Sequence, residues 1–265
     1  MPADRKPVAL EIDDLYKSYG SQDVLKGVSL SVGPGEIYAL MGPSGSGKSV
    51  LLKHLIGLER PTRGRTLIDG MDAADPATHH KVRTSMVFQA GALFNSMSVF
   101  DNLALYLREH RICGESEIRE RVNQTMDALG LQDAAAKIPA ELSGGMRKRV
   151  AVARSIVMEP QVILYDDPTS ELDPVTAATV SELIAEVRDR TGATSFVVTH
   201  DRDLMLGVAD RAALLMRGDL VFEGTPKEFS SSDDKDVRTF LHPKIAPRAP
   251  RAEGDRSVST QSFSS

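Results

Sequence analysis

The sequence predicts an α/β protein built around a mainly parallel β-sheet. Short runs rich in β-branched residues alternate with helical stretches along most of its 265 residues, and this alternation is typical of strand–helix–strand units. A glycine-rich segment at residues 42–49 also joins one β-rich run to an apolar helical stretch, as in the strand–loop–helix units of parallel sheets.

Several β-rich runs predict the individual strands. They are residues 28–32, 36–40, 86–89, 162–165, 195–199 and 212–216. The turn Gly33-Pro34-Gly35 separates the first two runs. The turn signal Arg217-Gly218-Asp219 follows the last run and precedes residues 220–223, so a β-hairpin is expected there.

Residues from about 95 to 158 are expected to form a helical insertion between two β-containing parts. The segment shows little β-branched alternation and several helical periods. Leu103, Leu107 and Ile112 lie near one face of a first predicted helix. The apolar positions of a second helix, which Gly130 is expected to end, are Ile118, Val122, Met126 and Leu129.

Composition and charge narrow the function classes. The chain carries 32 Lys and Arg against 37 Asp and Glu, a net charge of -5, and surfaces that bind nucleic acid are usually basic, so no nucleic-acid partner is expected. The one cysteine, Cys113, excludes an internal disulfide. No apolar run approaches the ~18 residues that a membrane span needs, so any role at a membrane is expected to come through a partner.

The segment Gly42-Pro43-Ser44-Gly45-Ser46-Gly47-Lys48-Ser49 fits the phosphate-binding pattern G-x-x-x-x-G-K-[ST]. It lies between a predicted strand and the apolar helical run Val50–Ile56, which is the context that the pattern requires. Its glycines let backbone N–H groups surround a phosphate at a helix N-terminus. Lys48 is expected to reach the β- and γ-phosphates and Ser49 to offer a hydroxyl to Mg²⁺. GTPases, nucleotide kinases, helicases and transport ATPases all share such a loop.

Two further motifs narrow the choice. The apolar run at residues 162–165 leads into Asp166, and a carboxylate at a rigid strand end is suited to hold Mg²⁺ or its water shell. Leu142-Ser143-Gly144-Gly145-Met146 opens a helix that is expected to continue to Val157. Its exposed backbone donors make a second candidate anion site, and an ordinary N-cap by Ser143 is an equal alternative.

Together these motifs resemble the ATP-binding cassette (ABC) ATPases over roughly residues 8–230. The resemblance rests on the phosphate loop, Gln89 at a strand end, the signature Leu142–Met146, Asp166, the D-loop Ser170–Asp173 and His200 after the last parallel strand. It implies a P-loop NTPase (RecA-like) core with an ABC-type antiparallel β subdomain and an inserted helical subdomain. It also implies an ATPase that uses ATP and Mg²⁺.

The resemblance further implies a homodimer in which ATP lies between two copies. The phosphate loop and Val50 of one copy would face the signature residues Ser143, Gly144, Gly145 and Met146 of the other. Tyr19 would stack on adenine, with Tyr16 as a competitor for that role. The implied ligands of Mg²⁺ are Ser49, Gln89 and Asp166, and the implied catalytic residues are Asp167, His200 and Gln89.

Asp167 departs from the family pattern, in which a glutamate after the strand-end aspartate acts as general base. Asp has the same charge on a stem one methylene shorter, so the attacking water would be poorly aligned and hydrolysis slow. Glu171 stands where a small residue is common. Asp167→Glu is therefore expected to raise turnover. The alternative is that the local backbone already places Asp167 well, and in that case the longer side chain would lower turnover.

Three stretches resemble a narrower group, the ATPases of Mla/Mce-type lipid transporters. They are Phe88–Phe94 continuing to Asp101–Leu103, Leu107–His110 and Ser143–Val150, where Met146 stands at the common glutamine position. This likeness implies membrane permease subunits bound through the helical insertion, an Mce-type lipid-binding partner, and a location on the cytoplasmic face of the inner membrane. The alternatives are a regulatory or scaffold ABC ATPase outside transport, and an ABC transporter ATPase for another substrate.

The C-terminal residues 243–265 are rich in Pro, Arg and Ser, a composition that predicts disorder. The ATPase domain is accordingly expected to span residues 8–242, and loss of residues 244–265 to leave ATP binding intact. Phe240 and Leu241, just before the tail, are expected either to pack on their own domain or to anchor the tail to the other protomer.

Overall fold

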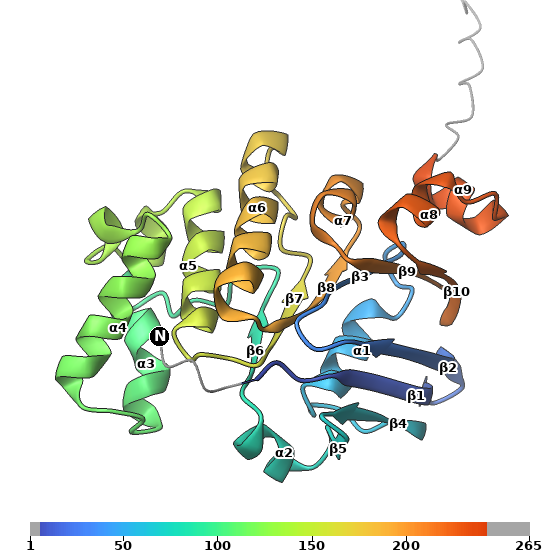
Figure 1. Ribbon diagram of the computed structural model, residues 1–265, viewed down its shortest axis with the longest axis horizontal. Coiled ribbons are helices and arrows are strands. Elements are labelled where there is room, and N and C mark those ends of the chain that lie inside the picture. Colours follow the sequence, from blue (N-terminus) through green and yellow to red (C-terminus); the bar gives the residue numbers. More distant parts are fainter. Residues whose placement is uncertain (1–5, 243–265) are drawn as a thin grey trace, which may run out of the picture.

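The computed structural model describes residues 6–242, which form two β-sheets with helices around them (Figure 1). The larger sheet contains β3 (Ile37–Met41), β6 (Thr84–Val87), β7 (Val162–Asp166), β8 (Thr194–Thr199), β9 (Arg211–Met216) and β10 (Asp219–Gly224). Its strand order is β10-β9-β3-β8-β7-β6. β10 runs antiparallel to β9 as the predicted hairpin, and the other neighbours are parallel.

The smaller sheet is antiparallel and lies beside the larger one (Figure 1). Its strands are β1 (Leu10–Tyr19), β2 (Gln22–Val32), β4 (Arg63–Ile68) and β5 (Met71–Asp72), in the order β2-β1-β4-β5. The run at residues 28–32 is therefore the end of a longer strand. Sequence patterns missed β1 because Asp13, Asp14 and Lys17 lie at its partly exposed positions and interrupt the expected alternation.

Helices cover both faces of the six-stranded sheet. The α-helices of the described residues are α1 (Lys48–Leu55), α2 (Pro76–Lys81), α3 (Val99–Glu109), α4 (Glu115–Ala128), α5 (Gly144–Ile156), α6 (Pro174–Thr191), α7 (Arg202–Val208), α8 (Pro226–Ser231) and α9 (Lys235–Leu241), and not all of them contact this sheet. In Figure 1, α5, α6 and α7 lie along one face, whereas α1 lies on the other face next to the antiparallel sheet. Within residues 6–242, no helix combines the length and the apolar character needed to cross a membrane. The α/β fold class, with the P-loop core and the two subdomains, is confirmed.

Each central strand supplies two hydrophobic cores, because successive side chains point to opposite faces of a sheet. On β7, Ile163 and Tyr165 join the cluster under the helical side, whereas Val162 and Leu164 join the cluster beneath α1 and the antiparallel sheet. This burial on both faces explains why the strand reads as an uninterrupted apolar run.

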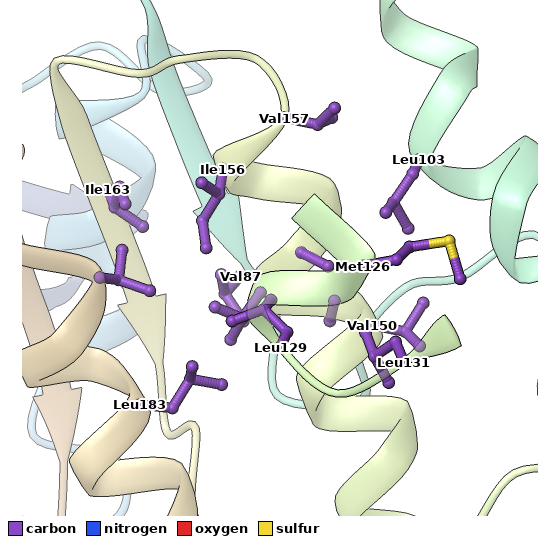
Figure 2. Close-up of a cluster of buried hydrophobic side chains, with 14 of the residues drawn as sticks. Val87, Leu103, Met126, Leu129, Leu131, Val150, Ile156, Val157, Ile163 and Leu183 are labelled. Atoms are coloured by element: carbon purple, nitrogen blue, oxygen red, sulfur yellow. The ribbon is translucent and has the colours of Figure 1, made fainter. Parts of the chain in front are cut away.

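The three helices between β6 and β7 pack onto the sheet through one continuous cluster (Figure 2). The residues labelled in Figure 2 are Val87, Leu103, Met126, Leu129, Leu131, Val150, Ile156, Val157, Ile163 and Leu183. They come from the strands, from α3 to α6 and from the segments beside them, so α5 is fixed between the outer helices and the sheet.

Two local expectations need correction. β6 ends at Val87, so Gln89 lies in the turn beyond the strand, where the Gly91 N–H donates to the Phe88 carbonyl at 2.8 Å. α3 ends at Glu109, before Ile112. Arg111 adopts a left-handed φ of 49° and breaks the helix, although Ile112 still packs against the same cluster. Gly130, with a φ of 62°, follows α4 as expected.

The last described helix, α9, packs on its own domain. Val237 is fully buried, and Phe240 and Leu241 pack against the cluster that includes Phe229. This geometry matches the first of the two roles expected for Phe240 and Leu241. The tail assigned to residues 243–265 lies outside the described residues.

Leu103→Ala is expected to lower the free energy of unfolding by about 2–5 kcal/mol, because it leaves a cavity between the helices and the sheet. Leu103 is fully buried, whereas Leu58 is 68% exposed. Leu58→Ala therefore serves as a control and is expected to stay within about 0.5 kcal/mol of the parent. Urea unfolding followed by circular dichroism measures both, and equal stabilities for the two variants would contradict the packing described.

Candidate functional site

The glycine-rich loop runs from the carboxyl end of β3 to the start of α1, and two of its glycines cannot be replaced without distortion. A Cβ at Gly42 would lie 2.3 Å from the Leu215 carbonyl oxygen, and one at Gly47 would lie 2.8 Å from Leu25 Cδ2. Both residues have positive φ angles, 154° and 109°, which favour glycine. The sequence therefore dictates a tight loop whose backbone lies open at a helix N-terminus, and such a loop fits an anionic phosphate group.

Lys48, the first residue of α1, points back over this loop. Its ammonium group donates hydrogen bonds to the carbonyl oxygens of Gly42 at 2.7 Å and Pro43 at 2.9 Å. Burial lowers the pKa of this amine, and the carboxylates of Asp167 and Asp166 act against that effect. The loop thus presents a partly buried cation beside its own backbone donors, which is the charge arrangement that a polyphosphate requires.

A cavity of about 380 Å³ opens next to the loop. The residues that line it are Val24, Ser44, Gly45, Gly47, Lys48, Ser49, Val50, Gln89, Asp166, Asp167 and Val198. They come from the antiparallel sheet, the loop, the turn after β6 and the carboxyl ends of β7 and β8. Parallel strands end at one edge of a sheet, where α/β proteins bind their ligands, so the fold brings most of the predicted residues together.

The oxygens in this cavity fit a magnesium ion. Ser49 Oγ lies 3.4 Å from Asp166 Oδ1, and Gln89 lines the same cavity. A hydroxyl, a carboxylate and an amide oxygen are ligands that Mg²⁺ accepts. Burial raises the pKa of the Asp166 carboxyl, and a bound cation would offset the cost of burying its charge.

Asp167 follows β7 and contacts His200, which follows β8. Asp167 Oδ2 lies 2.8 Å from His200 Nδ1, and Thr199 Oγ1 lies 3.4 Å from the other carboxylate oxygen. Asp167 adopts a left-handed φ of 49°, and its N–H donates to the Val198 carbonyl at 2.8 Å. The His200 side chain is 63% exposed, and it does not line the phosphate cavity but a separate one that it shares with Ser170 and Glu171 of the D-loop.

The signature segment lies apart from this cavity, since none of its residues lines it. Ser143 caps α5 by accepting a hydrogen bond from the Met146 N–H at 3.2 Å. A Cβ at Gly145 would lie 2.6 Å from Thr176 Cγ2, so glycine permits α5 and α6 to approach closely at this end. One chain therefore carries two separate features suited to anions, and both readings of Ser143, as N-cap and as part of an anion site, fit the geometry.

Of the two candidate adenine platforms, Tyr19 is the more exposed, although the Lys17 amine lies 4.9 Å from its ring centre. It is 46% exposed, and its hydroxyl donates to a carboxylate oxygen of Glu59. Tyr16 lies under the guanidinium group of Arg63, at 4.9 Å from the ring centre, and close against Gly27. Neither tyrosine lines the phosphate cavity, so stacking by Tyr19 stays a prediction.

Sequence reasoning missed Lys148 on α5. Its side chain is buried, and its amine reaches the loop of Gln89 and the D-loop. The available signal was its spacing, because Lys148 stands one helical turn before Val152 on the buried and mainly apolar face of α5. A charged residue in phase with buried positions is a reason to expect a specific partner.

Comparison with known proteins agrees with this geometry. The model of the ABC transporter family matches residues 25–170. The chain is 44% identical over 256 residues to the probable ribonucleotide transport ATP-binding protein mkl of Mycobacterium leprae, covering 95% of this chain and 74% of that protein. It is 38% identical over 236 residues to the intermembrane phospholipid transport system ATP-binding protein MlaF of Haemophilus influenzae, covering 88% and 89%.

A solved structure shares the fold. It is the dimeric post-hydrolysis state of the ATP-binding cassette MJ0796 bound to ADP and Pi, with a TM-score of 0.74 and 30% identity, covering 82% of this chain and 98% of that chain. The present chain has the phosphate loop, the strand-end carboxylates and the signature together in one domain with this fold. The chain therefore belongs to the ABC transporter family, as an ATP-binding subunit that hydrolyses ATP.

Proposed function

We propose that this ATPase drives the movement of phospholipid or another lipid, together with separate permease subunits and an Mce-type lipid-binding partner. The observation that carries the lipid substrate is the similarity to MlaF, which extends over nearly the whole of both chains. A second candidate is ribonucleotide transport, which the higher identity to mkl favours. The segments around Phe88–Phe94 and Ser143–Val150 support the lipid reading through their likeness to Mla/Mce-type ATPases.

At the ATP site, the loop N–H groups and Lys48 would bind the β- and γ-phosphates. Ser49, Asp166 and Gln89 would hold Mg²⁺, which neutralises phosphate charge when bound. Asp167 would accept a proton from the attacking water, and the contact with His200 fixes the direction of its carboxylate. His200 would contact the γ-phosphate, and its 63% exposed side chain leaves its ring accessible to a ligand.

The separation of the signature from the phosphate cavity supports a site shared between two copies. One chain carries both features at different places, so two copies related by a two-fold axis can place each signature against the other copy's nucleotide. A head-to-tail homodimer would then contain two equivalent ATP sites.

The permease is proposed to dock in a groove between β6 and α3. The groove has a volume of about 470 Å³, and Met86, Phe88, Phe94 and Leu105 are among its apolar lining residues. Phe94 is 51% exposed and Phe88 38%, and gathered exposed apolar side chains are typical of protein interfaces. Docking there would place the ATPase on the cytoplasmic face of the inner membrane.

Lys48→Ala is expected to lower kcat for ATP hydrolysis by about 10²–10³-fold, because it removes the cation that stabilises charge on the transferring phosphoryl group. Lys227→Ala, at an exposed position on α8, is the control and is expected to match the parent. A phosphate-release assay at saturating ATP measures both. Parental turnover in Lys48→Ala would overturn the assignment of the phosphate site.

Asp167→Asn is expected to lower kcat by about 10²–10⁴-fold, the contribution of a general base, and to leave ATP affinity nearly unchanged. Asp167→Glu is expected to raise kcat, because the longer side chain brings the carboxylate nearer to the water. Asp201→Asn is the matched control, since Asp201 caps α7 and asparagine caps equally well. Steady-state ATPase assays with the permease present measure kcat for the parent and the three variants. A lower kcat for Asp167→Glu would show that Asp167 is already well placed.

Phe94→Asp is expected to abolish co-purification with the permease, because it places a charge in the apolar groove. The exposed side chain can change without unfolding the domain, so ATP binding should persist. Leu58→Asp alters another exposed apolar residue, one that does not line the groove, and is expected to leave the complex intact. A stable complex with Phe94→Asp would place the permease elsewhere on the surface.

The substrate is tested with the purified transporter in vesicles. ATP-dependent transfer of a labelled phospholipid, absent when the ATPase carries Lys48→Ala, is expected. ATP-dependent movement of a labelled ribonucleotide without lipid transfer would overturn the lipid proposal and favour the second candidate. Activity of the ATPase without any permease in the complex would instead support a role outside transport.

A further inference from the structure

Lys148 joins three elements of the domain through one buried side chain. It lies on α5 and is 7% exposed. Its amine donates a hydrogen bond to the backbone carbonyl oxygen of Gln89 in the turn after β6 and lies 3.4 Å from Ser170 Oγ in the D-loop after β7. The helix that begins with the signature is thereby tied to both loops that border the phosphate cavity.

Arg154, six residues further along α5, supports the first of these loops only. Its guanidinium group donates to the carbonyl oxygens of Ala92 at 2.7 Å and Gly91 at 3.2 Å. Ala92 adopts a left-handed φ of 47°, a conformation that is uncommon for residues other than glycine. The backbone from Gln89 to Ala92 therefore takes its shape from two basic side chains of α5.

Packing alone does not explain an amine at position 148. No carboxylate of the described residues 6–242 forms an ion pair with Lys148. Burial lowers the pKa of its amine, and the charges of Asp167 and Glu171 act against that effect. Burying an ammonium group costs free energy that an apolar side chain of similar length would avoid. Unlike an apolar side chain, the amine can form hydrogen bonds to two separate loops, at Gln89 and Ser170.

We propose that Lys148 is a positioning residue that holds the Gln89 turn and the Ser170–Asp173 loop in a fixed relation, so that both respond together when ATP enters. It acts through Gln89 and Ser170 and does not touch the nucleotide. The proposal rests on the assignment of Gln89 to the ATP site and is independent of the transported substrate.

If Lys148 has this role, its loss should lower the turnover of ATP without lowering the affinity for ATP. Lys48 and the loop glycines bind the phosphates, so ATP affinity should not depend on Lys148. Alignment for hydrolysis should depend on it, because a displacement of about 1 Å at a reacting centre can cost on the order of 10²-fold in rate. A residue needed only for folding would lower stability and ATP affinity together.

The test uses Lys148→Met in the full-length chain, with kcat and KM from steady-state ATPase assays and Kd from titration with a fluorescent ATP analogue. We expect kcat to fall by about tenfold or more, with Kd and thermal midpoint close to the parent. Lys227→Met, an exposed substitution of the same type, is the control. Turnover within twofold of the parent, or a Kd that rises as much as kcat falls, would overturn the proposal.

A double-mutant cycle tests the link to the D-loop. Ser170→Ala removes one partner of Lys148, so Lys148→Met combined with Ser170→Ala is expected to be no slower than Lys148→Met alone. Arg154→Met loosens only the Gln89 turn, and its effect on kcat is expected to multiply with that of Ser170→Ala. Independent, multiplied effects of the substitutions at 148 and 170 would overturn the link. Lys48→Ala in parallel separates this outcome from a failure of the ATP-site assignment itself.

Discussion

The burial of β3 in the middle of the parallel sheet is the constraint on which the nucleotide site depends. Residues 37–41 are completely buried, and the strand is hydrogen-bonded to β8 on one side and β9 on the other. The phosphate loop therefore starts from a fixed point. Because a Cβ at Gly42 would lie only 2.3 Å from the Leu215 carbonyl oxygen of β9, even the first residue of the loop is constrained by the sheet.

The side chains proposed for the ATP site divide into two groups by what supports them. Asp166 is the last residue of β7, and Asp167 and His200 directly follow β7 and β8, so all three share the rigidity of the sheet. Gln89 and the signature belong to a turn and a helix that pack through the helical insertion. Of the two basic side chains of α5, Lys148 connects these groups, because it contacts both the Gln89 turn and Ser170 after β7, whereas Arg154 contacts the turn alone.

Motifs confined to a few neighbouring residues could be predicted from the sequence. The loop at residues 42–49 and the cap at Ser143 depend on glycine conformation and on one hydrogen bond within a helical turn, and both are local effects. The parallel strands were predictable for a related reason, since burial on both faces leaves a plain apolar run.

Contacts between distant segments could not be predicted in the same way. Lys148 and Gln89 are 59 positions apart, and no periodic pattern encodes such a pairing. The same holds for Asp167 and His200, whose contact exists because β7 and β8 are adjacent in the sheet. Strand β1 was missed because an antiparallel strand with one solvent-facing side can carry charges there at little cost.

The surroundings of Tyr19 have a consequence for which nucleoside triphosphates the enzyme would accept. Glu59 binds its hydroxyl and also pairs with Lys17 and Lys53, and the Lys17 amine lies 4.9 Å from the ring centre. The aromatic plane is thus oriented before any ligand arrives. If Tyr19 stacks on the nucleotide as proposed, its ring would contact the flat face of the base and make no hydrogen bonds to the edge of the base. Stacking of this kind depends little on which base is bound. Guanine should then be tolerated nearly as well as adenine, so selectivity for ATP in a cell would follow from its abundance more than from recognition.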